Sequence, residues 1–257
     1  VVLLTISYAF LKSMKAANNL LFFCLVVLGL VHTVQGVLQI ERDLVESLAI
    51  EDAARYSDTL REFRTLYTSE VIERAVASGT RVTHDYKNDP GALPLPSTLS
   101  MLLGKRLTSR HGGDVRLYSD TPFPWRVRNR KPLDSFQSMA LEALRDEPSN
   151  PVLRFEESDG VTVVRYATAD LMRESCVECH NTHPDSPKKD WVVGDVRGVL
   201  EVSRPVTSSW SSMRLDIRNS LRTVVLVSAL GLLGLGVVVT ILRRLAQYNQ
   251  ELAERTV

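Results

Sequence analysis

Two long stretches of this 257-residue chain carry no charged side chain, and they constrain the fold more than any other feature. Residues 20–38 read LLFFCLVVLGLVHTVQGVL, and residues 223–241 read TVVLVSALGLLGLGVVVTI. An α-helix needs about 20 apolar residues to cross the hydrocarbon core of a bilayer. Each stretch therefore predicts a membrane-spanning helix, although His32 and Gln35 make the first a weaker signal than the second.

A cleaved signal peptide or a buried core helix would also explain the first stretch. No A-x-A cleavage pattern follows it, and the chain runs on through Gln39, Ile40 and Glu41, which suit a continuing helix. We therefore expect an uncleaved anchor. Lys12 and Lys15 precede this stretch and acidic residues follow it, so the positive-inside rule places the N-terminus in the cytoplasm.

The second stretch has arginines on both sides and indicates no orientation of its own. Two spans return the chain to the side on which it began, so the first span determines the topology. The segment between the spans is long enough to bury one hydrophobic core. The expected organisation is a cytoplasmic segment at 1–19, transmembrane helices at 20–38 and 223–242, a periplasmic domain at 39–222, and a cytoplasmic amphipathic helix or coiled-coil connector at 243–257.

Residues 41–78 contain neither proline nor glycine and predict a long helix that continues out of the first span. Gly79 is placed to end this helix. Apolar residues at three- or four-residue spacing, or its multiple, form one stripe along it. The stripe consists of Leu44, Leu48, Tyr56, Leu60, Phe63, Tyr67, Val71 and Ala75. Such a stripe packs against a core or against a second copy of the chain, and we expect a homodimer through the long helices.

The remaining sequence alternates between short strand and helix patterns. The extended segments are VRLYS, VLRFEES, VTVVRYA and VRGVLEVSRPV, and Asp159-Gly160 between the second and third is a strong hairpin signal. Ser97 and Asp134 are placed to cap helices that run to about Leu107 and Arg145. Antiparallel strands with short helices, and long helices at both ends, predict an α+β fold. A net charge of +1 implies no nucleic-acid partner.

One short motif carries the chemistry of this sequence. Residues 175–191 read SCVECHNTHPDSPKKDW and hold two of the three cysteines and two of the five histidines. Cys176, Cys179 and His180 form C-x-x-C-H, the pattern of c-type haem attachment. In such sites the two thiols bind the two vinyl groups of the porphyrin, and the histidine that follows is an axial ligand of the iron. The motif predicts one covalently bound haem c per chain.

Three other kinds of site fit parts of this motif. A redox dithiol would be expected in a βαβ context and needs no histidine. A zinc ion would recruit both cysteines with His180 and His183. Its ligands would include the adjacent Cys179 and His180, which make a strained pair, and Pro184 breaks the turn. A disulfide between the two cysteines is the third alternative. We favour haem, because the motif lies in the segment expected outside the cytoplasm, where haem is attached.

The run RYATADLMRESCVECHNTHPDSPKKDWVVGDVRGVLEVSRPV, with LYSDTPFPWR and HDYKNDPGALPLPSTLS upstream, resembles a family of bacterial c-type haem domains. The likeness covers most of residues 40–210. It implies a PAS-like antiparallel sheet with flanking helices, outside the inner membrane and between two transmembrane helices. Family members commonly stand before cytoplasmic histidine kinases or nucleotide and diguanylate cyclases, so a cytoplasmic output domain or partner protein is implied. NQELAERT resembles the coiled-coil connector that often precedes such outputs.

By this resemblance, the two cysteines of the motif are the thioether attachments and His180 is the proximal ligand. The resemblance does not identify the ligand on the other face of the haem. Cys24 lies within the first span and His183 follows too closely on His180, so neither is expected there. We predict His84 as the distal metal ligand, with a vacant or water-filled site as the alternative. The remaining candidates are His111, Met101, Met139 and Met172.

Haem propionates require cationic partners, and aromatic side chains pack well against the ring. We predict Arg126 and Arg165 as the propionate partners. We predict Trp125, Tyr118 and Tyr166 as ring contacts. Each of these five residues also suits an ordinary core or surface position.

The sequence contains no evident catalytic triad, phosphate-binding loop or paired-carboxylate arrangement, so no enzyme is expected. We expect a membrane-anchored periplasmic haem protein of the bacterial inner membrane that senses redox state or a small gas and signals across the bilayer. The alternative is an electron-transfer or accessory haem subunit of a membrane complex. A five-coordinate haem would favour sensing, and a six-coordinate haem that binds neither CO nor NO would favour electron transfer.

Overall fold

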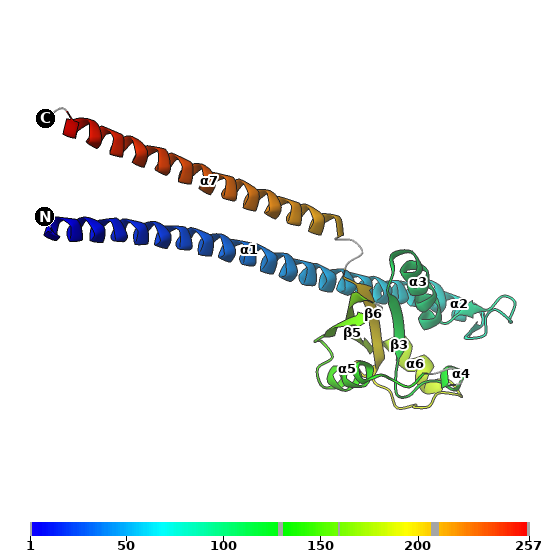
Figure 1. The fold of residues 1–257 in the computed structure, drawn as a ribbon. Coiled ribbons are helices and arrows are strands. Elements are labelled where there is room, and N and C mark those ends of the chain that lie inside the picture. The colour runs from blue at the N-terminus through cyan, green and yellow to red at the C-terminus, as the bar shows by residue number, and fades with distance from the viewer. Residues whose placement is uncertain (1, 128–130, 159, 207–210, 256–257) are drawn as a thin grey trace. The chain divides into compact units, whose positions relative to one another are not determined.

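The computed structural model describes residues 2–127, 131–158, 160–206 and 211–255. The chain divides into two compact units, Val1–Leu44 with Ser211–Val257, and Val45–Trp210. Helix α1 (Val2–Tyr67) contributes to both units, and α7 (Ser211–Arg255) belongs to the first (Figure 1). The strands and the remaining helices belong to the second unit, which we call the sheet domain.

Helices α1 and α7 each contain an apolar segment long enough to cross a membrane. The segments lie within Cys24–Ala77 and Arg218–Asn249, and their most apolar windows have mean hydropathies of 1.6 and 2.7. Only 6% and 0% of these windows is buried inside the protein. Extended apolar surface without protein cover is compatible with a membrane anchor. The two predicted spans are therefore confirmed as helices of sufficient length and apolarity.

The helical segment does not end with α1. A π-helical turn, η1 (Thr68–Ile72), follows directly and leads into α2 (Glu73–Ala77). Gly79 has a φ of 82°, and its N–H donates to the carbonyl oxygen of Val76 at 3.0 Å. Glycine with positive φ is the usual residue just beyond a helix. The predicted end at Gly79 is confirmed.

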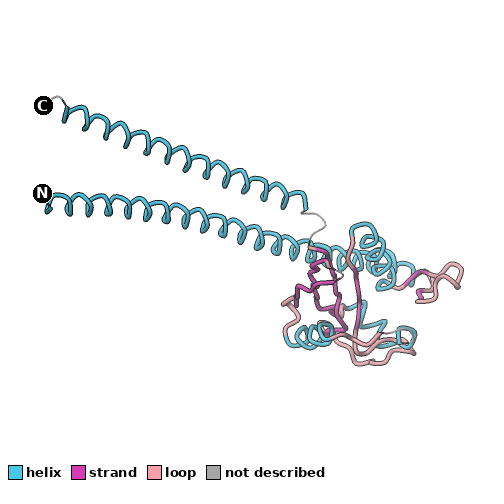
Figure 2. The backbone as a smooth tube through the Cα atoms, in the orientation of Figure 1, coloured by secondary structure: helices cyan, strands magenta, loops and turns pink. Residues whose placement is uncertain are grey.

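Four antiparallel strands form the central sheet, in the order β3–β6–β5–β4. Figure 2 shows them as one magenta group beside cyan helices. Ser158 pairs with Val161 and Gly160 has a φ of 74°, so the predicted hairpin forms, while Asp159 lies outside the described residues. A separate parallel pair joins β1 (Val82–Thr83) to β2 (Leu93–Pro94). The bounds of the four strands are Asp114–Tyr118 (β3), Val152–Ser158 (β4), Val161–Leu171 (β5) and Val196–Pro205 (β6).

The two faces of the central sheet are covered by different helices. Along β5, Val164 and Tyr166 belong to an apolar cluster with α1, whereas Ala167 and Ala169 belong to a cluster with α5 (Ser135–Asp146). Successive strand residues point to opposite faces, which explains this division. The antiparallel sheet between helices confirms the predicted α+β class.

The face of α1 that packs on the sheet differs from the predicted stripe. Leu44, the first residue of that stripe, is 42% exposed, and only Leu60 of the stripe is fully buried. Small side chains let a helix approach a sheet closely, and a search for large apolar residues overlooks them. The buried face, with exposures of 4% or less, consists of Val45, Ala49, Ala53, Ser57 and Leu60.

Two further helices were predicted from their caps. Helix α3 (Pro96–His111) has Leu95 as its N-cap and Pro96 in its first turn, so the predicted cap at Ser97 is wrong. Proline is favoured at the first helical position because no helical bond needs its missing N–H. The predicted cap of α5 is confirmed, because the Asp134 carboxylate accepts from the N–H of Gln137 at 2.9 Å. The Gln137 side chain accepts in return from the N–H of Asp134 at 3.2 Å, which completes a capping box.

Candidate functional site

Helix α6 (Glu174–Thr182) carries the C-x-x-C-H motif shortly after the end of β5. Cys176 and Cys179 are three residues apart, which places their side chains on one face of the helix. Both thiols are free. Although Cys179 is exposed, partial loss of hydration at its thiol, reinforced by the neighbouring Cys176 and Glu178, raises the pKa of this thiol, which is protonated at neutral pH.

Helix α6 is attached to the sheet domain from outside its core. None of its nine residues, all of which the structure describes, is fully buried, and His180 is partly buried. Hydrogen bonds hold it instead, because the Asn181 amide donates to the carbonyl of Trp191 at 2.9 Å and accepts from the N–H of Trp191 at 3.0 Å. At the N-cap of α6, Arg173 donates to the hydroxyl of Thr65 on α1.

His180 is the next residue after the second cysteine. Burial, the positive charge of Arg197 and the neighbouring His183 together lower the pKa of His180 to about 4, against the opposing charge of Asp170. The imidazole is therefore neutral at neutral pH. A neutral imidazole nitrogen is the form that binds a metal.

Aromatic rings from three segments gather around His180. The Phe123 ring lies 5.1 Å from His180 and 5.4 Å from His183. Phe123 also stacks on Trp125 of α4 (Pro124–Val127) at 4.4 Å, and Trp125 stacks on His84 at 4.2 Å. We call His84, Phe123, Trp125, His180 and His183 the aromatic cluster. It brings three predicted site residues together, namely His84, Trp125 and His180.

Arg197 of β6 lies beside this cluster, although no sequence motif distinguishes it. The Arg197 Nε–H donates to Nδ1 of His180 at 3.4 Å, and Nη1 donates to the Ser119 hydroxyl at 2.7 Å. Its guanidinium carbon lies 5.8 Å from the ring centre of Phe123 and 5.6 Å from that of Trp191. Its place depends on the pairing of β6 with β3, which a local sequence pattern does not reveal.

Arg165, a predicted propionate partner, has a different environment. Its guanidinium pairs with Glu201 at 2.8 Å, Asp134 at 2.9 Å and Glu156 at 3.2 Å. Burial opposes the charge of Arg165, but the three carboxylates overcome this effect and raise its pKa. The side chain also lies over the ring of Phe136 on α5, 4.4 Å from its centre. Arg165 thus links the sheet to α5, and it has no contact with the aromatic cluster.

The other predicted contacts are divided between the two sides of the domain. Tyr166 is 8% exposed in the apolar cluster with α1. Tyr118 packs against the cluster with α5, where burial and the nearby charge of Glu201 raise its pKa. Arg126 follows Trp125 on α4 and is exposed. Arg126 has no ion pair with another described residue.

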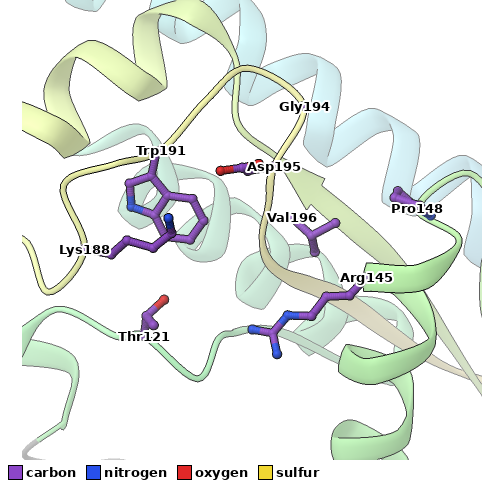
Figure 3. A pocket seen from close by; sticks show the side chains of 8 residues that line it. All are labelled: Thr121, Arg145, Pro148, Lys188, Trp191, Gly194, Asp195 and Val196. Atoms are coloured by element: carbon purple, nitrogen blue, oxygen red, sulfur yellow. The ribbon is translucent and has the colours of Figure 1, made fainter.

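An open cleft of about 410 Å³ lies next to this site (Figure 3). Trp191 forms part of its wall, and the indole lies 6.5 Å from the His180 ring. The cations at the cleft have acidic partners, because Lys188 pairs with Asp190 at 2.7 Å and Arg145 with Asp120 at 2.6 Å. The lining residues are Thr121, Arg145, Pro148, Lys188, Trp191, Gly194, Asp195 and Val196.

The donor set of the zinc alternative does not converge in the structure. Within the part of the chain that the structure describes, no three His, Cys, Asp or Glu side chains are grouped so as to hold a metal ion. Cys176, Cys179, His180 and His183 are among the described residues. The motif presents two thiols and one imidazole from a single helix.

These features define an α+β domain that presents a C-x-x-C-H helix beside an aromatic cluster. The chain belongs to the Tll0287-like family, whose model matches residues 41–205. The chain is also similar to a solved structure described as that of the cyanobacterial heme-protein Tll0287, with 17% sequence identity and a TM-score of 0.40. The alignment covers 62% of the present chain and 95% of the Tll0287 chain. No curated protein matches the chain.

Proposed function

We propose that this chain is a membrane-anchored haem protein whose C-x-x-C-H helix binds one haem c covalently. The observation that carries the proposal is the position of His180. Its neutral imidazole lies on the same helix as two free thiols and contacts the Phe123 ring of the aromatic cluster. The family takes its name from Tll0287, which is described as a cyanobacterial heme-protein. Membership of that family supports haem as the bound group here.

The residues present fit this group. Cys176 and Cys179 would hold the porphyrin through thioether bonds. Each thiol would add across a vinyl double bond, with sulfur bonding to one carbon and hydrogen to the other, so no oxidant would be consumed. His180 would bind the iron through Nε2. When bound, haem supplies an iron centre that changes oxidation state and can take a small ligand at an open position.

In this proposal the two apolar helices cross the bacterial inner membrane, and the sheet domain lies in the periplasm. Lys12 and Lys15 before the first apolar segment support a cytoplasmic N-terminus. Two spanning helices then return the chain to the cytoplasm. The antiparallel sheet between α1 and α5 is compatible with the PAS-like fold that the sequence resemblance implies.

A sensor of redox state or of a small gas is the function we favour. The segment just before α6 is bonded to α1, because Asp170 pairs with Arg64 and Arg173 donates to Thr65. A change at the haem that moves α6 would therefore act on the helix that continues into the first apolar segment. Signalling requires such an element with two states, one of which the ligand favours.

Covalent attachment is tested in the full chain, produced in bacteria that attach haem c. Wild-type protein should keep its haem through acid-acetone extraction and show a matching gain in mass. Cys176→Ser with Cys179→Ser should lose it, whereas Cys24→Ser, at the third cysteine, should keep it. Extraction of all haem from the wild type would refute covalent attachment. CO or NO binding by the ferrous holoprotein then tests sensing against electron transfer, since a haem that binds neither would favour the latter.

A further inference from the structure

One guanidinium beside the C-x-x-C-H helix has no carboxylate partner. Arg197 is half-buried on β6 and contacts the rings of Phe123 and Trp191. Among the described residues, no acidic side chain lies within ion-pair distance of it. A charge removed from water requires a partner of opposite charge or full hydrogen bonding. Neither is complete here.

The acids whose charges act on Arg197 are bound to other arginines. Asp120 pairs with Arg145 at 2.6 Å. Asp170 pairs with Arg64 at 3.0 Å. Both carboxylates are therefore already matched, and Arg197 is left as an uncompensated positive charge at the site.

The hydrogen bonds of Arg197 leave most of its donors free. A guanidinium has five N–H groups. One donates to His180 Nδ1 and one to the Ser119 hydroxyl. Ser119 in turn donates to the carbonyl of Arg197 at 2.6 Å, which holds strand and side chain together. The remaining three N–H groups have no partner among the described residues, so a planar anion could be bound by two of them.

We propose that Arg197, positioned by Ser119, binds a propionate carboxylate of the haem. This inference rests on the proposed haem binding. It replaces Arg165 as propionate partner, because the guanidinium of Arg165 is already bound to three carboxylates. Arg126 is the rival, since it also lacks an ion pair with a described residue and follows Trp125 on α4.

Iron binding would strengthen the need for an anion at Arg197. A neutral imidazole has a single N–H. When Nε2 binds iron, the proton resides on Nδ1, which then cannot accept from Arg197. The Nε–H that now donates to His180 would be released and would need another acceptor. A carboxylate on the same haem meets that need.

The test compares haemin with its dimethyl ester, which has no ionised carboxylate. The protein is the full chain in detergent with Cys176→Ala and Cys179→Ala, so that both porphyrins bind reversibly. We expect this parent to bind haemin about tenfold more tightly than the ester, the effect of one charge-assisted pair. Arg197→Gln should lower haemin affinity by about the same factor and leave ester affinity unchanged. Arg197→Lys keeps the charge but loses the planar guanidinium that can bind a carboxylate through two N–H groups, so it should retain part of the preference for haemin.

Two further variants make the result specific. Arg126→Gln tests the rival, and Arg116→Gln, half exposed on β3 and paired with Asp114, is the matched control. Both should keep the preference for haemin. The proposal is overturned if Arg197→Gln keeps that preference, if Arg126→Gln loses it, or if the parent binds both porphyrins equally. If Arg197→Gln does not fold, Ser119→Ala and Arg197→Lys replace it, and each should reduce the preference for haemin over the ester.

Failure of the underlying function gives a different pattern. If the wild type carries no acid-stable haem and the parent binds neither porphyrin, haem binding itself is wrong and the role of Arg197 falls with it. If the wild type carries acid-stable haem while the preference is absent, only the role of Arg197 is wrong. In the covalent holoprotein, Arg197→Gln should also lower the midpoint potential, because loss of a nearby cation favours ferric iron.

Discussion

Arg64 and Asp170 form an ion pair between α1 and β5, with 3.0 Å between Nη1 and the carboxylate. The two side chains are only 8% and 14% exposed. Taking both charges out of water is costly, and each depends on the other for compensation. The pair joins the helix that carries the first apolar segment to the strand that ends just before α6.

Removal of one partner should therefore cost more than removal of both. Asp170→Ala leaves a buried arginine and should lower the free energy of unfolding of the sheet domain by about 3 kcal/mol. Arg64→Met with Asp170→Leu replaces both charges by apolar groups of similar volume and should recover most of this loss. Denaturant unfolding of the full chain in detergent measures both. Additive losses in the double variant would contradict this account.

The N-cap of α5 predicts a dependence of stability on pH. Burial opposes ionisation of Asp134, but bonds from the N–H of Gln137 and from Arg165 overcome it and hold the pKa of Asp134 below its ordinary value of 3.8. A carboxyl whose pKa is lowered by folding stabilises the fold above its ordinary pKa, and this contribution is lost as the pH falls through the folded value. Asp134→Ala should cost about 1 kcal/mol at pH 7.

Asp134→Asn separates the charge from the cap. The amide oxygen still accepts from Gln137, so most of the cap should remain at pH 7. The amide does not titrate, so the loss of stability as the pH falls through 3.8 and below should be smaller than in the wild type. Thermal unfolding at a series of pH values measures this slope. An unchanged slope would show that Asp134 does not contribute to acid sensitivity.

No side chain larger than that of glycine fits at position 198, next to Arg197. A Cβ at this position would lie 2.3 Å from the carbonyl oxygen of Tyr118, which is backbone and cannot move aside independently. Gly198→Ala should separate β3 from β6 and cost about 1–3 kcal/mol. Gly36→Ala on α1, where nothing lies within 4 Å of the added carbon, is the control and should cost nothing. Equal melting temperatures for Gly198→Ala and the wild type would refute the close contact.

His84 remains the predicted distal ligand. Its ring is stacked on Trp125, which in turn stacks on Phe123 next to His180. His84→Ala should therefore change the ferrous absorption spectrum of the holoprotein, while His111→Ala should not. Identical spectra for His84→Ala and the wild type would remove His84 as ligand and favour the vacant or water-filled site.

Topology is tested with single cysteines in a background that carries Cys24→Ser, Cys176→Ser and Cys179→Ser, so that no native thiol is labelled. Asn88→Cys lies in an exposed turn of the sheet domain, and Gln247→Cys lies on α7 beyond the second apolar segment. A maleimide that cannot cross membranes should label position 88 in intact cells from which the outer membrane has been removed. Position 247 should be labelled only after lysis. The reverse pattern would invert the proposed orientation.

Local signals in the sequence predicted those elements whose causes are local. The cap at Asp134 and the hairpin between Ser158 and Val161 each depend on neighbours within a few residues. The face of α1 was missed because Ala49, Ala53 and Ser57 owe their burial to a sheet far along the chain. A pattern of large apolar residues does not contain that information.

The same distinction holds for the candidate site. C-x-x-C-H is contiguous and could be recognised directly, and LYSDTPFPWR indicated Trp125. Arg197 could not be distinguished from the other arginines, because its neighbours are far from it in the sequence: Ser119 directly follows β3, and His180 lies on α6. The sequence also suggested Arg165 as a propionate partner, because its pairing with Glu201 is visible only in the folded structure.

Helix α6 lies outside the core, and this has a consequence for the order of events in biogenesis. Neither apolar cluster of the sheet domain includes a residue of α6, all of whose residues are described. The central sheet can therefore form while both thiols are still accessible. If haem is attached as proposed, attachment and folding of the core would be independent steps, and a chain without haem could still form its core.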